Sequence, residues 1–388
     1  MASGPERIVI VGAGPAGLST ARAYREHGGE GEVTLLGNEA LLPYERPPLT
    51  KEFLRGKLPA SELPIEPLEW FAENEVQLRL GSSVTAIDPE NGVVRLDGQI
   101  ELRADAIVLA TGAEPQRPPI PGAEHPSLLT IRALADSERA IAMGEPGRRT
   151  TVIGTGFIGC EAAASLAMRG AAVTLIGEER LPQLARLGED AAEHIANWLT
   201  QLGVELIGGA QVASLDPPGV VELTDGRLIP SEAVLLATGV RPRGELAQAA
   251  GMEMSDGAVV VDQGMRAKGM VLAVGDVACA HNVCAGRHLR VEHWGDALGH
   301  GKVAGRTLAQ GDGKWEEVPG FWSTIGEQTL KYSAWGDGFE RARLVSGENG
   351  AFTVWYERQG VTVGVLTHDH DGDYMRGREL IAGKVPTP

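Results

Sequence analysis

Short apolar runs that end in glycine-rich turns dominate the first two thirds of the chain. Residues 7–11 (RIVIV) form a continuous apolar run, and GAGPAG follows at 12–17. A helical pattern then extends over about 18–28, and a second apolar run occupies 33–36 (VTLL). Apolar runs of this length between breakers favour buried strands, so the pattern predicts a strand, a tight turn, a helix and a second strand.

The same order of elements returns near residue 150. TTVI at 150–153 leads to GTGFIG at 154–159, a predicted helix through about Arg169 and a strand at 173–176. A second pair of segments is also repeated, because DAIVLATGAEP at 105–115 resembles EAVLLATGVRP at 232–242. In each copy a buried strand is predicted to end in a Thr-Gly turn.

Hairpin signals precede both Thr-Gly turns. Asn91-Gly92 and Asp225-Gly226 are dipeptides typical of tight turns between antiparallel strands. Because both the glycine turn and the Thr-Gly turn occur twice in the same order, the sequence indicates two dinucleotide-binding domains built on one plan.

The pattern changes after about residue 316. Alternation in residues 351–366 predicts antiparallel strands with one exposed face, and 373–383 reads as a short helix. Half of the aromatic residues of the chain gather here: Trp315, Phe321, Trp322, Tyr332, Trp335, Phe339, Phe352, Trp355 and Tyr356. We therefore expect an α/β protein with two Rossmann-like dinucleotide-binding domains, the first comprising 1–115 with 240–315 and the second 116–239, and a smaller α+β C-terminal domain, 316–388.

Composition narrows the classes of function. Among 388 residues, 35 Lys+Arg against 52 Asp+Glu give a net charge of −17, which argues against nucleic-acid binding. No apolar run is long enough to span a membrane, and MASGPER is no signal peptide, so a cytoplasmic protein is expected. Three cysteines make neither a disulfide framework nor a metal-ligand set, so no metal site is expected and any redox centre should be an organic cofactor.

The first glycine turn has the spacing of a dinucleotide fingerprint. Gly12 permits the tight turn, Gly14 lets a pyrophosphate approach, and Gly17 lets helix pack on strand, with Pro15 and Ala16 between them. The pyrophosphate would then meet the N-terminus of the helix. An acid about 20 residues on should bind the ribose. Glu39 is the candidate, and Asn38 is a polar alternative. Glu39 could instead be an ordinary exposed acid of the loop.

The second glycine turn repeats this spacing with Gly154, Gly156 and Gly159, and encloses Phe157 and Ile158. Glu178 and Glu179 follow its second strand. Two acids repel a 2′-phosphate and accept a ribose diol, so they favour NADH. Arg180 keeps NADPH open, because an arginine can bind that phosphate.

A third element is MVLAVGDVA at 270–278, where a strand ends in Gly275-Asp276. An acid at such a strand end can bind the ribityl chain of a flavin, whereas an ordinary turn aspartate is the alternative. Together the three elements predict an oxidoreductase that binds FAD in the first domain (1–115 with 240–315) and NAD in the second (116–239).

The chain resembles the FAD-dependent ferredoxin reductases that serve bacterial oxygenases, within the glutathione-reductase-like flavoproteins. The most specific stretch is PYERPPLTK at 43–51. The resemblance implies that Arg46 and Pro47 contact FAD and that Lys51 lies beside the flavin ring, paired with Glu161. It also implies further contacts to FAD, from Val84, Ala110, Thr111, Gly112, Arg132 and Trp294, and to NAD, from Thr238 and Gly239. Read without the resemblance, Lys51 and Glu161 could be solvated surface charges, and Trp294 could be a core residue.

The resemblance further implies hydride transfer from NADH to FAD and one-electron transfer to a [2Fe–2S] ferredoxin that feeds an oxygenase, by a monomer or homodimer. A thiol-based disulfide reductase is disfavoured, because residues 40–51 contain no cysteine. One departure leaves the acceptor open: Thr324-Ile325-Gly326 stands where the family has an Asp-Gln pair. An NADH oxidase, a quinone- or dehydroascorbate-type reductase and an NADH-sensing flavoprotein like apoptosis-inducing factor are the alternatives.

Overall fold

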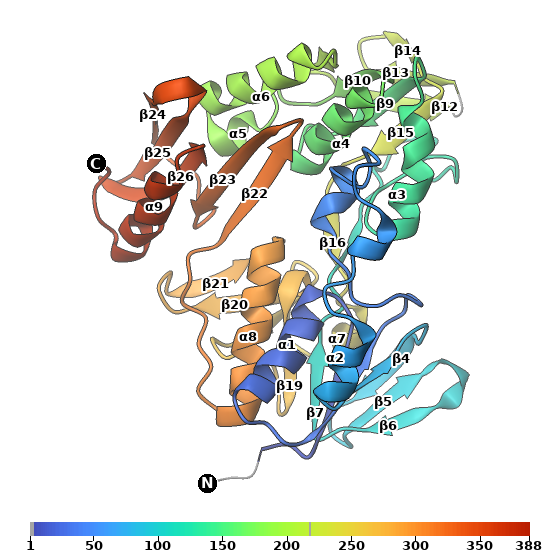
Figure 1. Cartoon of the computed structure of the whole chain (residues 1–388), viewed down its shortest axis with the longest axis vertical. Helices are drawn as coiled ribbons and strands as arrows, with labels where there is room; N and C mark the ends of the chain where they lie inside the picture. The colour runs from blue at the N-terminus through green and yellow to red at the C-terminus, as the bar shows by residue number, and fades with distance from the viewer. Residues whose placement is uncertain (1–3, 217–218) are drawn as a thin grey trace. The chain divides into compact units, whose positions relative to one another are not determined.

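The computed structural model describes residues 4–216 and 219–388 (Figure 1). By its internal contacts the chain divides into two compact units. The first unit comprises Met1–Glu45, Pro64–Glu114 and Arg241–Phe321, and the second comprises Arg46–Leu63, Pro115–Val240 and Trp322–Pro388. The predicted three-domain division remains a prediction. In the structure, residues 46–63 and 322–388 pack with residues 115–240 in the second unit.

A parallel sheet forms the centre of the first unit, in the order β19–β7–β1–β2–β3. Its apolar runs pair along their whole length, which is typical of a parallel sheet covered on both faces. Its strands are β1 (Arg7–Val11), β2 (Glu32–Leu36), β3 (Val76–Arg79), β7 (Ala106–Leu109) and β19 (Val271–Ala273).

Two helices of the first unit pack closely against each other, α1 (Pro15–Glu26) and α8 (Trp294–Gln310) (Figure 1). Glycines on α8 allow this approach. A Cβ on Gly301 would lie 2.5 Å from the carbonyl oxygen of Ala16, and one on Gly305 would lie 2.6 Å from Ala23. The hydroxyl of Ser19 also donates to the carbonyl of Leu298 at 2.8 Å. The helix that follows the first glycine turn is therefore held by a helix from far along the chain.

Smaller elements complete the first unit, among them an antiparallel sheet in the order β4–β5–β6 and a mixed sheet in the order β17–β18–β20–β21. They are α2 (Leu68–Glu73), β4 (Val84–Asp88), β5 (Val93–Leu96), β6 (Glu101–Arg103), β8 (Ala113–Pro115, which ends at the boundary), α7 (Glu245–Ala249), β17 (Met254–Ser255), β18 (Ala258–Val261), β20 (Ala278–Asn282) and β21 (Arg287–Arg290).

The second unit repeats the parallel plan in the order β11–β10–β9–β15. An antiparallel sheet, β12–β13–β14, follows it. The elements are α3 (Leu134–Ile141), β9 (Arg149–Ile153), α4 (Phe157–Met168), β10 (Ala172–Ile176), α5 (Leu184–Leu187), α6 (Glu189–Gln201), β11 (Glu205–Ile207), β12 (Val212–Asp216), β13 (Val220–Leu223), β14 (Leu228–Pro230), β15 (Ala233–Leu236) and β16 (Val240–Pro242, at the boundary).

Residues 322–388, here called the C-terminal subdomain, carry most of an antiparallel sheet in the order β22–β23–β26–β25–β24. Helix α9 (Asp371–Gly383) packs on β26, where a Cβ on Gly377 would lie 2.4 Å from Val365. The strands are β22 (Gly320–Ile325), β23 (Gln328–Ala334), β24 (Arg341–Ser346), β25 (Phe352–Arg358) and β26 (Val361–His368).

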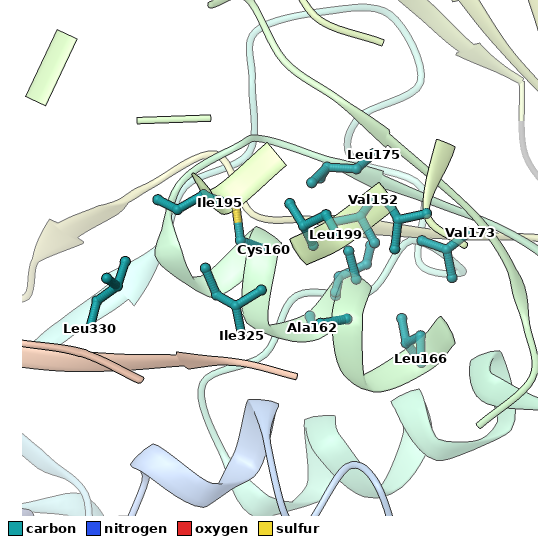
Figure 2. Packing of buried hydrophobic residues seen from close by; sticks show 14 of the residues in the cluster. Val152, Cys160, Ala162, Leu166, Val173, Leu175, Ile195, Leu199, Ile325 and Leu330 are labelled. Atoms are coloured by element: carbon teal, nitrogen blue, oxygen red, sulfur yellow. The ribbon is translucent and has the colours of Figure 1, made fainter. Parts of the chain in front are cut away.

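One hydrophobic core joins the three segments of the second unit. Leu54 comes from 46–63, Leu199 comes from α6, and Phe352 comes from the C-terminal subdomain. Figure 2 shows Ile325 and Leu330 of the C-terminal sheet beside residues of α4 and α6, among them Cys160, Ile195 and Leu199. Burial of apolar surface is the largest stabilising term in folding, so these segments stabilise one another.

The predicted elements are confirmed in both copies, together with the fold class. Both glycine turns lie between a strand and a helix, and Asn91-Gly92 lies in the β4–β5 hairpin. The helix at 373–383 and the antiparallel strands at 351–366 are also present. Among the described residues, no helix combines the length and the apolar character that crossing a bilayer requires.

Candidate functional site

The first glycine turn is built so closely that two of its glycines are required. Gly12 has φ +118°, and a Cβ there would lie 2.1 Å from the carbonyl oxygen of Ala110. A Cβ on Gly17 would lie 2.1 Å from the carbonyl oxygen of Gly12. In contrast, apart from Gly14 itself and its two chain neighbours, no described atom lies within 4 Å of the Cβ position of Gly14. The first and third glycines therefore serve the packing of the turn, while the middle one faces open space.

The second glycine turn has the same construction. Gly154 has φ +110°, and a Cβ there would lie 2.3 Å from the carbonyl oxygen of Ala237. A Cβ on Gly159 would lie 1.9 Å from the carbonyl oxygen of Gly154. Beyond the chain neighbours of Gly156, the nearest atom to its Cβ position is the side-chain nitrogen of Gln183, 3.7 Å away. In both copies the first and third glycines lie against the corresponding backbone carbonyls, and the space beside the middle glycine is left open.

This geometry fits a bound pyrophosphate in each copy. Helices α1 and α4 begin at Pro15 and Phe157, directly after the open glycine, so their first N–H groups face the side from which an anion can approach. The space beside Gly14 and Gly156 is where the phosphates must come close to the backbone. The turns therefore suit the two dinucleotides that the spacing predicts.

The two Thr-Gly turns lie next to these glycines. The backbone N–H of Ala110 donates to Val11 and that of Ala237 donates to Ile153, both at 2.8 Å. The threonine hydroxyls are used within the turns. Thr111 donates to the carbonyl of Arg243 at 2.7 Å, and Thr238 donates to that of Gln116 at 2.8 Å. Gly112 and Gly239 both have positive φ, at +70° and +99°.

The strand-end acids differ in what they contact. Tyr44 donates its hydroxyl to Glu39 at 2.7 Å. In the second copy Glu178 is exposed, whereas Glu179 accepts the backbone N–H of Ala185 at 3.1 Å. Arg180 forms an ion pair with Glu189 at the start of α6. Glu178 is therefore the acid available to a ribose, and the arginine that could bind a 2′-phosphate already has a carboxylate partner.

A buried histidine lies behind the Gly275-Asp276 turn. Gly275 has φ +73° and donates its N–H to Nδ1 of His300 at 3.3 Å, and both Asp276 and His300 are buried. Since Nδ1 accepts, the proton of the neutral ring is on Nε2, which has no hydrogen-bond partner within the described residues. Burial lowers the pKa of His300 to about 4, while Asp296 and Asp276 act in the opposite direction. The sequence alone gave no indication of this residue.

Lys51 and Glu161 form a buried ion pair in the second unit. Lys51 Nζ lies 3.0 Å from Glu161 Oε2, and the residues are 6% and 3% exposed. Thr50 donates to the same carboxylate oxygen at 2.5 Å, and Ser323 donates to Oε1 at 2.8 Å. Such a pair is stable in a protein interior only when its remaining hydrogen-bonding positions are filled, as they are here for the carboxylate.

Serines hold the segment that carries Lys51. Ser165, one turn after Glu161 on α4, donates to the carbonyl of Thr50 at 2.7 Å, and Ser137 of α3 donates to that of Leu49 at 2.6 Å. Sequence reasoning missed all of these hydroxyl groups. The spacing of Glu161 and Ser165, which places both on one face of a helix, was the one available signal.

Other predicted site residues fall in both units. In the second unit Arg46 donates to the carbonyl of Arg132 at 2.6 Å, and Pro47 begins the short helix that ends at Thr50. In the first unit Trp294 is the first residue of α8, and Val84 is the first residue of β4. Cys160, next to Glu161, is buried, and burial raises the pKa of its thiol. Cys279 is also buried, while Cys284 is partly exposed, and both are free thiols.

Comparisons with known proteins agree with this geometry. The family model described as pyridine nucleotide-disulphide oxidoreductase matches residues 6–301. The chain is 33% identical to the anthranilate 1,2-dioxygenase system ferredoxin–NAD(+) reductase component of Burkholderia cepacia, over 98% of this chain and 95% of that protein. It is 30% identical to the probable ferredoxin reductase CtmF of Castellaniella defragrans, over 98% and 94%.

A solved structure shows the same fold over almost the whole length. The crystal structure of the covalent putidaredoxin reductase–putidaredoxin complex aligns with a TM-score of 0.92 at 28% identity, covering 98% of this chain and 94% of that chain. The resemblance inferred from residues 43–51 and the two glycine turns is thereby confirmed. The chain belongs to the pyridine nucleotide-disulphide oxidoreductase family, among the ferredoxin reductases of bacterial oxygenase systems.

Proposed function

We propose that this chain binds FAD at its first glycine turn and NADH at its second, and passes electrons from NADH to a small [2Fe–2S] ferredoxin. The observation that carries the proposal is the duplication: Gly12 and Gly154 meet the carbonyls of Ala110 and Ala237 in the same way, and each turn leaves its middle glycine open. One chain with two such sites is suited to electron transfer between two nucleotide cofactors.

Bound FAD would supply the conversion of a two-electron donor, NADH, into one-electron steps. The residues of the chain supply positions and charges. The first N–H groups of α1 and α4 would hold the pyrophosphates, and Asp276 would hold the ribityl chain. Lys51, paired with Glu161, would supply an ammonium group toward the flavin ring. The full proposed FAD set is Gly12, Gly14, Pro15, Ala16, Gly17, Asn38, Glu39, Arg46, Pro47, Lys51, Val84, Ala110, Thr111, Gly112, Arg132, Gly275, Asp276 and Trp294.

The second turn is proposed to prefer NADH. Glu178 is exposed and can accept both hydroxyls of a ribose, while Arg180 is paired with Glu189 and is less available to a 2′-phosphate. The proposed NAD set is Gly154, Gly156, Phe157, Ile158, Gly159, Glu161, Glu178, Thr238 and Gly239.

A ferredoxin is the proposed acceptor because the relatives are named as ferredoxin reductases and one is solved with putidaredoxin. The departure at 324–326 has a packing explanation. Ile325 lies in the hydrophobic core, and Gly326, with φ +63°, forms the turn to β23, where a Cβ would lie 2.8 Å from Leu202. Ile325 and Gly326 therefore serve the interior of the second unit.

Anaerobic titration of the purified holoenzyme with NADH and then with NADPH tests the donor. We expect the visible flavin absorbance to bleach with one equivalent of NADH and to respond to NADPH only at much higher concentration. A preparation that lacks flavin, or a flavin that NADH leaves oxidised, would contradict the proposal. The variant Lys51→Met tests the role of a single residue. If NADH reduces its flavin as fast as that of the native enzyme, Lys51 does not have the role assigned to it.

Steady-state turnover with different electron acceptors tests the second part of the proposal, the transfer of electrons to a ferredoxin. Rates with a [2Fe–2S] ferredoxin should exceed those with dioxygen or a quinone by at least about tenfold, the factor that 1.4 kcal/mol of transition-state stabilisation supplies. Faster turnover with dioxygen or quinone would indicate an oxidase or quinone reductase. Negligible turnover with every acceptor, after normal reduction by NADH, would indicate a sensor.

A further inference from the structure

The carboxylate of Glu161 is held by donors from two segments distant in sequence. Oε2 accepts from Thr50 at 2.5 Å and from Lys51 at 3.0 Å, whereas Oε1 accepts from Ser323 at 2.8 Å. Thr50 and Lys51 belong to the segment 46–63, and Ser323 belongs to β22 of the C-terminal subdomain. Both oxygens are thereby used, each from a different side.

Burial makes this arrangement sensitive to the loss of one donor. Ser323 is 1% exposed and Glu161 is 3% exposed, so bulk water has little access to replace a missing hydrogen bond. An unsatisfied buried group retains its full desolvation cost, and this cost is larger when the group is charged. Without the Ser323 hydroxyl, Oε1 loses this donor, and the carboxylate is free to turn toward the two donors on its other side.

The backbone of β22 keeps Ser323 in place. Alternation along the strand leaves Trp322 42% exposed and turns Ser323 inward, and Ile325, two residues on, is buried in the core shared with α4 and α6. The other side of the carboxylate is fixed as well, because Ser165 holds the carbonyl of Thr50. The C-terminal subdomain therefore reaches the ion pair through one hydroxyl group.

We propose that Ser323 is a positioning residue for the reaction: it shares the negative charge of Glu161, so that the ammonium of Lys51 is not drawn wholly to that carboxylate and remains effective toward bound FAD. This proposal rests on the proposed function, since it takes Lys51 to act on FAD. It assigns to the C-terminal subdomain an effect on reduction by NADH, independent of any acceptor.

The test compares Ser323→Ala with Ser231→Ala in the holoenzyme. Ser231 is a matched control, because it is also buried, donates to Thr151 at 2.9 Å and does not contact Glu161. For Ser323→Ala we expect the rate constant of reduction by NADH, per bound flavin, to fall about tenfold, a loss of about 1.4 kcal/mol. The Kd for NADH should stay within about twofold, as expected when an interaction acts mainly in the transition state.

The second readout is the reduction potential of the bound FAD, measured without NADH against a reference dye. We expect it to become more negative in Ser323→Ala and to be unchanged in Ser231→Ala. A structural role alone would lower flavin content or stability and leave the potential of the remaining holoenzyme unchanged. An unaltered potential together with an unaltered reduction rate would overturn the proposal.

Conservative variants keep the test decisive if Ser323→Ala does not fold. Ser323→Thr retains the hydroxyl and should restore the native rate and potential, whereas Ser323→Cys, nearly the same in shape but a weaker donor, should lie between the native and alanine values. Equal behaviour of the Thr and Cys variants would contradict the role of the hydrogen bond. Native enzyme that NADH fails to reduce would instead refute the proposed function, so the two failures are distinguishable.

Discussion

At His300, burial and an unpartnered ring nitrogen make one side chain a source of pH-dependent stability. The folded pKa of about 4 is below the usual 6.5, so the unfolded chain binds a proton that the folded chain excludes between these values. Stability is therefore complete above about pH 6.5 and declines as the pH falls toward 4. One pKa unit corresponds to about 1.4 kcal/mol, so about 2 kcal/mol should be lost between about pH 7 and pH 5.

Denaturant unfolding of the native protein and of His300→Gln at these two pH values measures the effect. Glutamine can still accept the N–H of Gly275 but does not titrate, so its stability should change less over this range, by about 2 kcal/mol. Equal changes in the two proteins would show that His300 is not responsible.

The residues of the site differ in how far the sequence could predict them. The resemblance to ferredoxin reductases implies that Lys51 pairs with Glu161, and the structure places their charged atoms 3.0 Å apart. Ser323 and Thr50 were not identified, since a hydroxyl group carries no signature and Ser323 lies 162 residues from Glu161. His300 was missed for a similar reason: its environment is created by packing of α8 on the Gly275 turn.

At the scale of elements, different glycines of one turn have different roles: Gly159 is needed for packing, and Gly156 leaves space for a ligand. Gly156→Ala places a methyl group in the open space beside α4, 3.7 Å from Gln183, without a clash. Gly159→Ala brings a methyl group to 1.9 Å from the carbonyl of Gly154, so helix and strand must move apart. Overpacking of this kind typically costs about 1–3 kcal/mol.

We therefore expect opposite results for the two variants. Gly156→Ala should keep the thermal stability of the native protein and weaken NADH binding about tenfold, because the methyl group occupies the space that the pyrophosphate approaches. Gly159→Ala should lower the melting temperature. Thermal melts and saturation of the reduction rate with NADH provide the two measurements, and similar melting temperatures for both variants would argue against the division of roles.

The strands on either side of the glycine turns could be predicted from the sequence, because burial on both faces of a parallel sheet requires continuous apolar runs, such as RIVIV at 7–11. The long helices α6 and α8 were not predicted. Short elements were less accessible. Helix α5 follows Gln183, a non-glycine residue with φ +61°, whose side chain donates to the carbonyl of Thr155 at 3.3 Å. This conformation depends on a contact across the turn and leaves no local pattern in the sequence.

At the scale of the whole molecule, the shared core predicts that the second unit opens as one cooperative body, in which the C-terminal sheet and the nucleotide-binding part depend on each other. The ring of Phe352 in β25 stacks on His194 of α6, with centroids 4.2 Å apart, and Trp198 and His368 lie beside them. Tyr356 donates its hydroxyl to the carbonyl of Leu187 at 2.8 Å. Local stability in α6 should therefore depend on residues of the C-terminal sheet.

Hydrogen exchange of Phe352→Ala tests this dependence. Truncation of a buried phenylalanine typically costs about 3–5 kcal/mol, and we expect the amide protons of α6 to lose a comparable protection. Met375→Ala, on the exposed side of α9 in the same subdomain, is the control and should leave α6 unchanged. Native protection of α6 in Phe352→Ala would mean that the two parts open separately.

The sequence predicts a change of architecture near residue 316, because aromatic content and alternation change there, and the division into three domains stays a prediction. It could not show that Leu54, Leu199 and Phe352 meet in one core, because a hydrophobic residue does not specify its partners. For the same reason, the sequence could not show that residues 46–63 group with the second unit.

The shared core has a consequence for engineering by recombination. A chimera that exchanges residues 322–388 for those of a relative, in order to change the electron acceptor, would graft a foreign surface onto α6 and onto Leu54. Crossover points at 322 alone would break complementary packing at Ile325 and Leu330. Recombinants that also carry the donor's α6 and its 46–63 segment should be recovered as folded protein more often than those that exchange the terminal piece by itself.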